Sequence, residues 1–485
     1  MFLTRRNLGK LAAAAMAPPF TGAAQPAGRG GGRQPLPQQG SAFPEKFAWG
    51  CSSSAYQIEG AVAEDGRKPS IWDTFSHTFG KTANGDTGDV AADSYHRYQT
   101  DVQLLRSLGA TAYRFSFSWP RIFPDGTGQP NEAGVAYYQR LTDELLQSGI
   151  EPYATLFHWD LPQALEDRVG GWQSRLTAQA FADYAGYVAA RFSDRIRNFI
   201  TVNEFSCFTD GGYYSGDKAP GKRLGSQIYQ VRHNGLLAHG LGVLAIRAAA
   251  RPETRVGLAD NPYVCVPAIE TKANVAAAQS AMRFTNAGLL TPVLEGSYPD
   301  AYLTGLGANA PRIAAGDMQA IGAPLDFLGL NIYSPVYVTA ADNAYGYALL
   351  PRPASSPHMA SSWLYVGPEC AYWGPRLASE IWKVKEIYIT ENGCSSDDVL
   401  TADRQVQDTD RVMYLRNHLW QAHRAAAEHI PLKGYFLWSL MDNFEWADGY
   451  SKRFGLHYVD FRSLERIPKL SAAFYREVIT QNAVV

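Results

Sequence analysis

Eight short runs of apolar, β-branched and aromatic residues recur along the chain. They lie at 46–52, 111–119, 151–159, 198–204, 255–261, 326–333, 386–392 and 434–440. Between them, stretches such as 93–109 and 180–192 place apolar residues three and four positions apart, which is typical of an amphipathic helix. Eight strand–helix units in one chain predict an α/β fold, a closed (β/α)8 TIM barrel.

An open, doubly wound sheet would show a similar alternation of strands and helices. Such a sheet normally carries a glycine-rich phosphate loop after a strand, and the sequence has no GxGxxG or Walker pattern. No composition break within 43–482 suggests a further domain, so we expect one barrel domain over residues 43–485. The long connection between the sixth and seventh predicted strands, 334–384, is rich in Pro and Trp and is predicted to form part of the active-site rim, together with the other long βα loops.

Several predicted strands are apolar along their length and carry a polar or aromatic group at their carboxyl end. These groups are His158, Glu204, Asn331, Glu391 and Trp438. In (β/α)8 barrels the active site lies on the face that these strand ends form. A buried Glu needs a partner, and two of these five residues are Glu.

Glu204 and Glu391 end the fourth and the seventh predicted strands, so they face each other across the mouth of the barrel. Two carboxyl groups across a sugar-sized cleft are what glycoside hydrolysis requires. One donates a proton to the leaving oxygen, and the other attacks the anomeric carbon or activates a water. A pair of Glu residues alone is weak support, because structural ion pairs are commoner.

The N-terminus predicts a targeting segment. Arg5, Arg6 and Lys10 precede a short apolar run and then small residues, which is the order of a secretory signal. The arginine pair resembles a bacterial twin-arginine signal, which exports folded proteins. We therefore expect a signal peptide over 1–24, a flexible Gly/Pro/Gln-rich linker over 25–42, and a periplasmic or secreted enzyme.

Charge and cysteine content give no sign of several kinds of partner or cofactor. The formal net charge of -2 gives no reason to expect binding to nucleic acid, nor to a membrane after signal removal. The five cysteines are scattered, without a CxxC pair or a Cys/His cluster, so no metal or other cofactor is expected. Buried free thiols are the simplest interpretation, although an exported protein could form one disulfide. The oligomeric state stays open.

A set of longer motifs carries a resemblance to a known family. In chain order they are SSAYQIEGA, YRFSFSWPRI, TLFHWDLPQ, TVNEF, LDFLGLNIYS, IYITENG, WSLMDNFEWADGYSKRFGL and YVDF. Together they span about 43–475 and resemble glycoside hydrolase family 1, the retaining β-glucosidases. The resemblance implies hydrolysis of terminal, non-reducing β-D-glucosyl residues through a covalent glycosyl-enzyme intermediate.

The family pattern implies a role for each residue of the catalytic centre. Glu204 matches the acid/base of the T-x-N-E-P motif, and Glu391 matches the nucleophile of the I-T-E-N-G motif. Arg114 resembles the family's arginine beside the nucleophile, and Tyr333 the tyrosine that donates a hydrogen bond to it. Asn331 is expected in the same network.

Sugar recognition needs polar groups for the hydroxyls and an aromatic surface for the apolar face of the ring. The resemblance implies hydroxyl ligands and aromatic contacts at eight positions. These are Gln57, His158, Asn203, Glu445 and Trp446 for hydroxyls, Trp438 for stacking, Phe454 at the pocket edge and Trp363 at the leaving-group site. The expected partner is a small-molecule β-glycoside or oligosaccharide.

One position departs from the family pattern: Phe205 stands where the family usually has Pro. Pro would fix the backbone just after the acid, so the fine position of Glu204 is open. Alternatives also stay open for the substrate: a β-galactosidase or β-fucosidase, or transglycosylation at the same site. A 6-phospho-β-glycosidase is disfavoured because Glu445 would repel phosphate, and a non-catalytic sugar-binding protein because both Glu residues are present.

Overall fold

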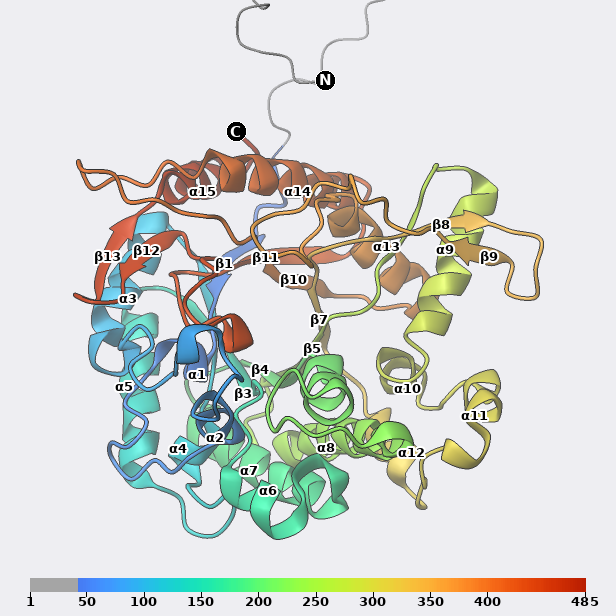
Figure 1. Ribbon diagram of the computed structural model, residues 1–485, viewed down its shortest axis with the longest axis horizontal. Helices are drawn as coiled ribbons and strands as arrows, with labels where there is room; N and C mark the ends of the chain where they lie inside the picture. Colours follow the sequence, from blue (N-terminus) through green and yellow to red (C-terminus); the bar gives the residue numbers. More distant parts are fainter. Residues whose placement is uncertain (1–41) are drawn as a thin grey trace, which may run out of the picture. The chain divides into compact units, whose positions relative to one another are not determined.

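The computed structural model describes residues 42–485, and its centre is a closed barrel of eight parallel strands (Figure 1). Around the barrel the strand order is β1-β11-β10-β7-β5-β4-β3-β2. The strands are β1 (Ala48–Ser52), β2 (Ala112–Ser116), β3 (Glu151–Phe157), β4 (Asn198–Asn203), β5 (Arg255–Asp260), β7 (Phe327–Asn331), β10 (Ile387–Asn392) and β11 (Leu432–Trp438). Each overlaps one of the eight predicted runs, so the predicted (β/α)8 barrel is confirmed.

Side chains fill the interior of the barrel. Tyr153 packs edge-on against Phe436 and Tyr388, with ring centroids 4.9 and 5.5 Å apart. The same buried cluster contains Phe327, and Gly257 gives that ring its space. A Cβ at Gly257 would lie 2.3 Å from the Phe327 ring. The interior is therefore a packed core, as in other barrels of this class, and the site lies at one end of it.

Long helices surround the strands, as Figure 1 shows. They are amphipathic as predicted: α14 buries Leu415, Leu419 and Ala422, which are four and three positions apart. The long helices are α3 (Ser94–Leu108), α5 (Glu132–Gln147), α7 (Arg175–Phe192), α8 (Ile228–Ala249), α9 (Lys272–Thr285), α13 (Cys370–Trp382), α14 (Thr409–Ala427) and α15 (Leu470–Gln481). No helix within residues 42–485 has the length and apolar character needed to cross a membrane.

Shorter elements occupy the connections. The short α-helices are α1 (Ala55–Ile58), α2 (Ile71–Ser76), α4 (Trp119–Ile122), α6 (Gln163–Val169), α10 (Leu290–Glu295), α11 (Asp300–Leu306) and α12 (Asp317–Ile321). A π-helix, η3 (Cys207–Ser215), follows β4, and 3₁₀ turns lie at Ala83–Gly85, Gly171–Gln173, Gly225–Gln227, Gly307–Asn309 and Trp446–Asp448. Two small sheets join β6 (Cys265–Pro267), β8 (Val336–Ala340) and β9 (Tyr347–Leu349), and β12 (His457–Asp460) with β13 (Glu465–Pro468). The predicted rim segment 334–384 thus contains β8, β9 and α13.

A buried ionic network braces the loop that follows β11. Asp442 in this loop pairs with Arg453 and with the fully buried Lys469, whose Nζ lies 2.6 Å from Asp442 Oδ1. Lys469 also pairs with Asp398, and Asp398 with Arg411. Because removal of one partner leaves a buried charge uncompensated, such a network holds its segments in a single arrangement. The braced loop carries the residues at 445 and 446.

Candidate active site

The two predicted catalytic carboxyl groups line one cavity at the carboxyl ends of the strands. Glu204 directly follows β4, and Glu391 is the fifth residue of β10. Their side chains are only 6% and 4% exposed. Both line a cavity of about 340 Å³, a size suited to a small ligand.

Glu391 is held by a cation and a hydroxyl group. Arg114 Nη1 donates to Glu391 Oε1 at 2.5 Å, and the Tyr333 hydroxyl donates to Oε2 at 2.9 Å. Burial raises the pKa of Glu391, and the adjacent Arg114 opposes this rise. Both carboxylate oxygens are thus occupied by donors that favour the ionised form.

Glu204 has a different environment. Asn331 Nδ2 donates to Glu204 Oε1 at 2.8 Å, and the Cys207 thiol is a second hydrogen-bond partner. Burial raises the pKa of Glu204, and the nearby Asp260 raises it further. Among residues 42–485, no Lys, Arg or His forms an ion pair with Glu204. The two carboxyl groups therefore differ in their neighbours: a cation and a hydroxyl group bind Glu391, whereas a neutral amide and a thiol bind Glu204.

Asn203 links the residue that binds Glu391 with the residue that binds Glu204. Its Oδ1 accepts from Arg114 Nη2 at 2.5 Å and from Asn331 Nδ2 at 2.9 Å. Its Nδ2 lies 3.0 Å from His158 Nε2. Burial holds the pKa of His158 well below its usual range, so the ring is neutral and Nε2 accepts this hydrogen bond. His158 Nδ1 then carries the proton and has no partner within residues 42–485, which leaves a donor for a ligand.

A second polar group lies at Glu445. Gln57 Nε2 donates to Glu445 Oε2 at 3.4 Å, and Ser54 Oγ donates to Gln57 Oε1 at 2.6 Å. Burial raises the pKa of Glu445 to about 8, and the charge of Lys218 opposes the rise. The amide and the carboxyl group together offer donors and an acceptor to sugar hydroxyls.

Aromatic rings form much of the cavity wall. The Trp438 and His158 rings are stacked with centroids 5.8 Å apart, and Trp446 packs against Trp159 at 4.4 Å. At the outer end Trp363 is 48% exposed and lies parallel to Phe454, at 6.4 Å. A buried ring within the cavity and an exposed ring at its rim suit a sugar inside and a leaving group outside.

The structure brings the predicted site residues together in two layers. Nine line the cavity: His158, Glu204, Tyr333, Trp363, Glu391, Trp438, Glu445, Trp446 and Phe454. The other four lie behind the wall and hydrogen-bond to lining residues or to one another: Arg114, Asn203, Asn331 and Gln57.

Sequence reasoning missed several lining residues, chiefly Lys218, Cys207, Asn261 and Asp448. The Lys218 ammonium lies 4.8 Å from the centre of the Trp159 ring. Within residues 42–485 it forms no ion pair and no hydrogen bond. Lys218 belongs to an irregular loop, and no periodicity in the sequence places it at the cavity.

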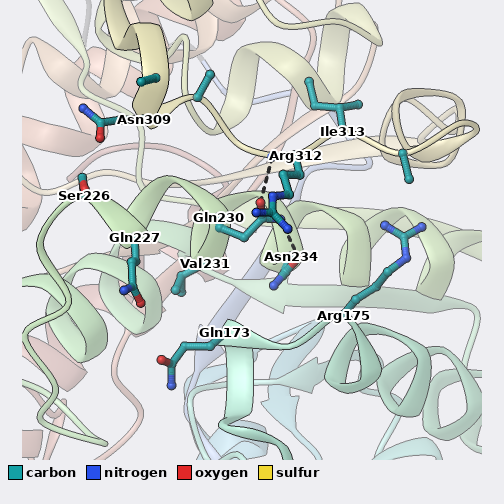
Figure 2. A pocket seen from close by; sticks show the side chains of 13 residues that line it. Gln173, Arg175, Ser226, Gln227, Gln230, Val231, Asn234, Asn309, Arg312 and Ile313 are labelled. Carbon is teal, nitrogen blue, oxygen red and sulfur yellow. Dashed lines mark hydrogen bonds between the residues drawn. The ribbon is translucent and has the colours of Figure 1, made fainter.

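A larger hollow, of about 630 Å³, lies elsewhere and is lined mostly by polar side chains (Figure 2). Gln230 accepts a hydrogen bond from the Arg312 amide at 2.8 Å and donates to Asn234 at 3.1 Å. None of the predicted site residues lines this hollow. The strand-end cavity, which nine of the predicted site residues line, is therefore the stronger candidate for catalysis.

The described residues offer no cluster of three His, Cys, Asp or Glu side chains that could hold a metal ion. The five cysteines are unpaired in the structure, and Cys207 alone among them is not buried.

Comparison with known proteins agrees with this geometry. Residues 39–484 match the sequence profile of Glycosyl hydrolase family 1. Beta-glucosidase A of Thermotoga maritima is 42% identical over 443 residues, which cover 91% of this chain and 98% of the relative. A bifunctional beta-D-glucosidase/beta-D-fucosidase of Bifidobacterium breve is 42% identical over 463 residues, with 91% and 99% covered.

Solved structures give the same result. The beta-glucosidase from Thermotoga maritima in complex with glucoimidazole superposes with a TM-score of 0.83 and 41% identity. The match covers 91% of this chain and all of that chain. With a matching profile over nearly its whole length, relatives above 40% identity and a shared barrel, this chain belongs to glycosyl hydrolase family 1.

Proposed function

We propose that the protein is a retaining β-glucosidase in which Glu391 is the nucleophile and Glu204 the acid/base. The single observation that carries this proposal is the unequal environment of two carboxyl groups on one cavity. Arg114 and Tyr333 hold Glu391, whereas an amide and a thiol hold Glu204. The relatives named above as beta-glucosidases support the glucoside as substrate.

The first step forms the glycosyl-enzyme. Glu391 attacks the anomeric carbon while Glu204 transfers its proton to the leaving oxygen, so the glycosidic bond breaks without releasing a free alkoxide. Tyr333 and Arg114 hold the attacking carboxylate in place. The Trp438 ring offers a surface for the apolar face of the sugar.

The second step releases the sugar. Glu204 has now given up its proton. Because esterification removes the negative charge of Glu391, the pKa of Glu204 falls and its carboxylate stays ionised. It can then act as a base and take a proton from the incoming water. The water oxygen then bonds to the anomeric carbon, and Glu391 leaves as a carboxylate. Two inversions give net retention of the β configuration.

The test is the configuration of the first sugar released. NMR spectra collected during the first turnovers of an aryl β-glucoside should show the β-anomer before mutarotation. Initial α-anomer would overturn the retaining assignment. A panel of aryl β-glucoside, β-galactoside, β-fucoside and 6-phospho-β-glucoside, assayed with the same enzyme, measures the glycone preference.

A β-fucosidase activity on the same site is the second candidate, because one relative is a bifunctional beta-D-glucosidase/beta-D-fucosidase. A 6-phosphoglycoside is disfavoured because Glu445 and Asp448 both line the cavity and offer a phosphate group acidic neighbours. Transglycosylation uses the same intermediate and differs only in the acceptor.

We also propose that the enzyme is exported from the bacterial cytoplasm after removal of residues 1–24. This segment lies outside the described residues, and the proposal rests on the arginine pair and the apolar run in the sequence.

A further inference from the structure

The end of β5 is bonded to each of the three residues that follow Glu204. The Phe205 amide donates to Asp260 Oδ1 at 3.0 Å. The next two contacts come from Asn261: its Oδ1 accepts from Ser206 Oγ at 3.1 Å, and its Nδ2 lies 3.5 Å from Cys207 Sγ. We call Asp260 and Asn261 the β5 clamp.

The clamp extends the pairing of β4 with β5 beyond the end of β4. Asn203 is in register with Ala259, and the Glu204 amide donates to the Ala259 carbonyl at 2.9 Å. At the next position the Asp260 side chain replaces the backbone carbonyl as acceptor. Glu204 is therefore fixed through its own amide and through the amide of the residue after it.

Glu204 needs such support because of its backbone conformation. Its φ is +53°, in the left-handed region that residues with a side chain adopt rarely. A conformation of this kind persists only where the surrounding structure holds it. The Phe205 ring is fully buried, and its centroid lies 6.0 Å from those of Phe208 and His239.

We propose that Asp260 is a positioning residue, which accepts the Phe205 amide and thereby aims the Glu204 carboxyl group at the leaving oxygen. This inference rests on the proposed role of Glu204 as acid/base. The amide is the part of Phe205 that a Pro could not supply, because Pro has no N–H group. Asp260 is 2% exposed and does not line the cavity, so it acts through the backbone of Glu204 and not on the substrate.

The acid role of Glu204 gives a readout that a purely structural defect would not reproduce. Departure of phenol from phenyl β-glucoside needs a proton, whereas departure of 2,4-dinitrophenolate does not. The constant kcat/KM reports glycosylation for both substrates. If the Glu204 carboxyl group is displaced, kcat/KM should fall for phenyl glucoside and stay nearly unchanged for dinitrophenyl glucoside.

The experiment compares Asp260→Ala, Asp260→Asn, Phe205→Pro and the double variant Asp260→Ala/Phe205→Pro. Asp260→Ala leaves the Phe205 amide without an acceptor and should lower kcat/KM for phenyl glucoside about tenfold or more, with less than about a twofold change for dinitrophenyl glucoside. Asp260→Asn keeps an acceptor oxygen but removes the charge, and it should restore most of the loss. Phe205→Ala, which keeps the amide and loses the ring, is the matched control for Phe205→Pro.

The effects of Asp260→Ala and Phe205→Pro on kcat/KM should also be non-additive. In the double variant, kcat/KM for phenyl glucoside should be no lower than in the worse of the two single variants, because either change alone already removes the hydrogen bond between the Phe205 amide and Asp260. If Asp260→Ala does not fold, Asp260→Ser replaces it, because its shorter side chain also withdraws the acceptor.

Three results would overturn the proposal: equal losses on the two substrates, independent losses in the double variant, or Asp260→Asn behaving like Asp260→Ala. The last result would mean that the charge of Asp260 acts, and not its hydrogen bond. Wild-type enzyme without β-glucosidase activity would instead reject the proposed function itself.

Discussion

At the scale of single residues, the neighbours of two identical side chains divide their roles. Glu204 and Glu391 are both buried, and burial raises the pKa of both. Arg114 and Tyr333 favour the charge on Glu391, whereas Asn331 gives Glu204 only a neutral donor. These unequal donors are the basis for assigning Glu204 as the proton donor and Glu391 as the nucleophile in the proposed mechanism.

Removal of each carboxyl group should therefore be rescued by different chemistry. Glu391→Gly removes the nucleophile and leaves space, so an α-glucosyl fluoride should serve as a donor and give transfer products. Glu204→Ala loses the acid and base, so azide should restore turnover of dinitrophenyl glucoside and give the β-glucosyl azide. Without rescue, both variants should lose at least about 100-fold in turnover, the usual contribution of such groups.

Product analysis by NMR checks both rescues. Wild-type enzyme with azide is the control and should release glucose alone. A Glu391→Ala enzyme that hydrolysed aryl β-glucosides at a near-normal rate would refute the nucleophile assignment.

Residue types and motif order predicted much of this site, and three-dimensional proximity explains the remainder. Glu204 and Glu391 end apolar runs, which marks them in the sequence. The partner of the Phe205 amide does not follow from local sequence, because Asp260 lies 55 positions away and only the pairing of β4 with β5 brings it close. The resemblance showed that Phe205 replaces a Pro, but not what receives its amide.

At the scale of secondary-structure elements, the barrel strands were predictable because each is a short, nearly continuous apolar run that the barrel buries. The burial of β2, β4, β7 and β10 is complete. The small strands were not predicted: β8 and β9 are half-buried, lie within a long connection, and lack a continuous apolar run. Loop residues such as Lys218 were not predicted for the same reason: no apolar run or periodicity in the sequence marks their position.

The loop that carries Lys218 gives a prediction for the pH dependence. Its backbone is fixed where the Lys218 amide donates to the Gly211 carbonyl and the Gly221 amide to the Lys218 carbonyl. The Lys218 charge lowers the pKa of Glu204, because a nearby cation favours the carboxylate. Lys218→Gln should therefore raise the pKa of Glu204, so the acid keeps its proton to a higher pH.

The measurement is the profile of kcat/KM against pH, which should be bell-shaped. Its low-pH limb reports protonation of Glu391, and its high-pH limb reports loss of the proton from Glu204. In Lys218→Gln the high-pH limb should move to higher pH, while kcat/KM at neutral pH changes by less than about tenfold, because a partly exposed charge is screened. Lys433→Gln, an exposed change in β11, is the control and should leave the high-pH limb in place. A high-pH limb that moved to lower pH in Lys218→Gln would refute the inference that the Lys218 charge lowers the pKa of Glu204.

At the scale of the whole molecule, the first and last strands of the barrel, β1 and β11, close it together. β1 pairs with β2 on one side and with β11 on the other. The Phe43 amide donates to the Asn482 carbonyl at 2.8 Å, and Trp49 Nε1 donates to Asn482 Oδ1 at 2.9 Å. Because the pairing of β1 with β11 and the contacts with Asn482 join residues more than 380 positions apart, the fold cannot close before nearly the whole chain is present.

This requirement bears on the proposed export route. A barrel that closes only with its last strand exposes apolar strands until then, so folding before transport protects it from aggregation. A twin-arginine signal serves proteins that are already folded. Replacing both Arg5 and Arg6 with Lys should therefore leave active, unprocessed enzyme inside the cell. The checks are β-glucosidase activity in the periplasmic and cytoplasmic fractions and the N-terminal sequence of the exported form, which should begin near residue 25. Lys10→Arg, outside the pair, should export normally; unchanged periplasmic activity in the double-Lys variant would exclude the twin-arginine route.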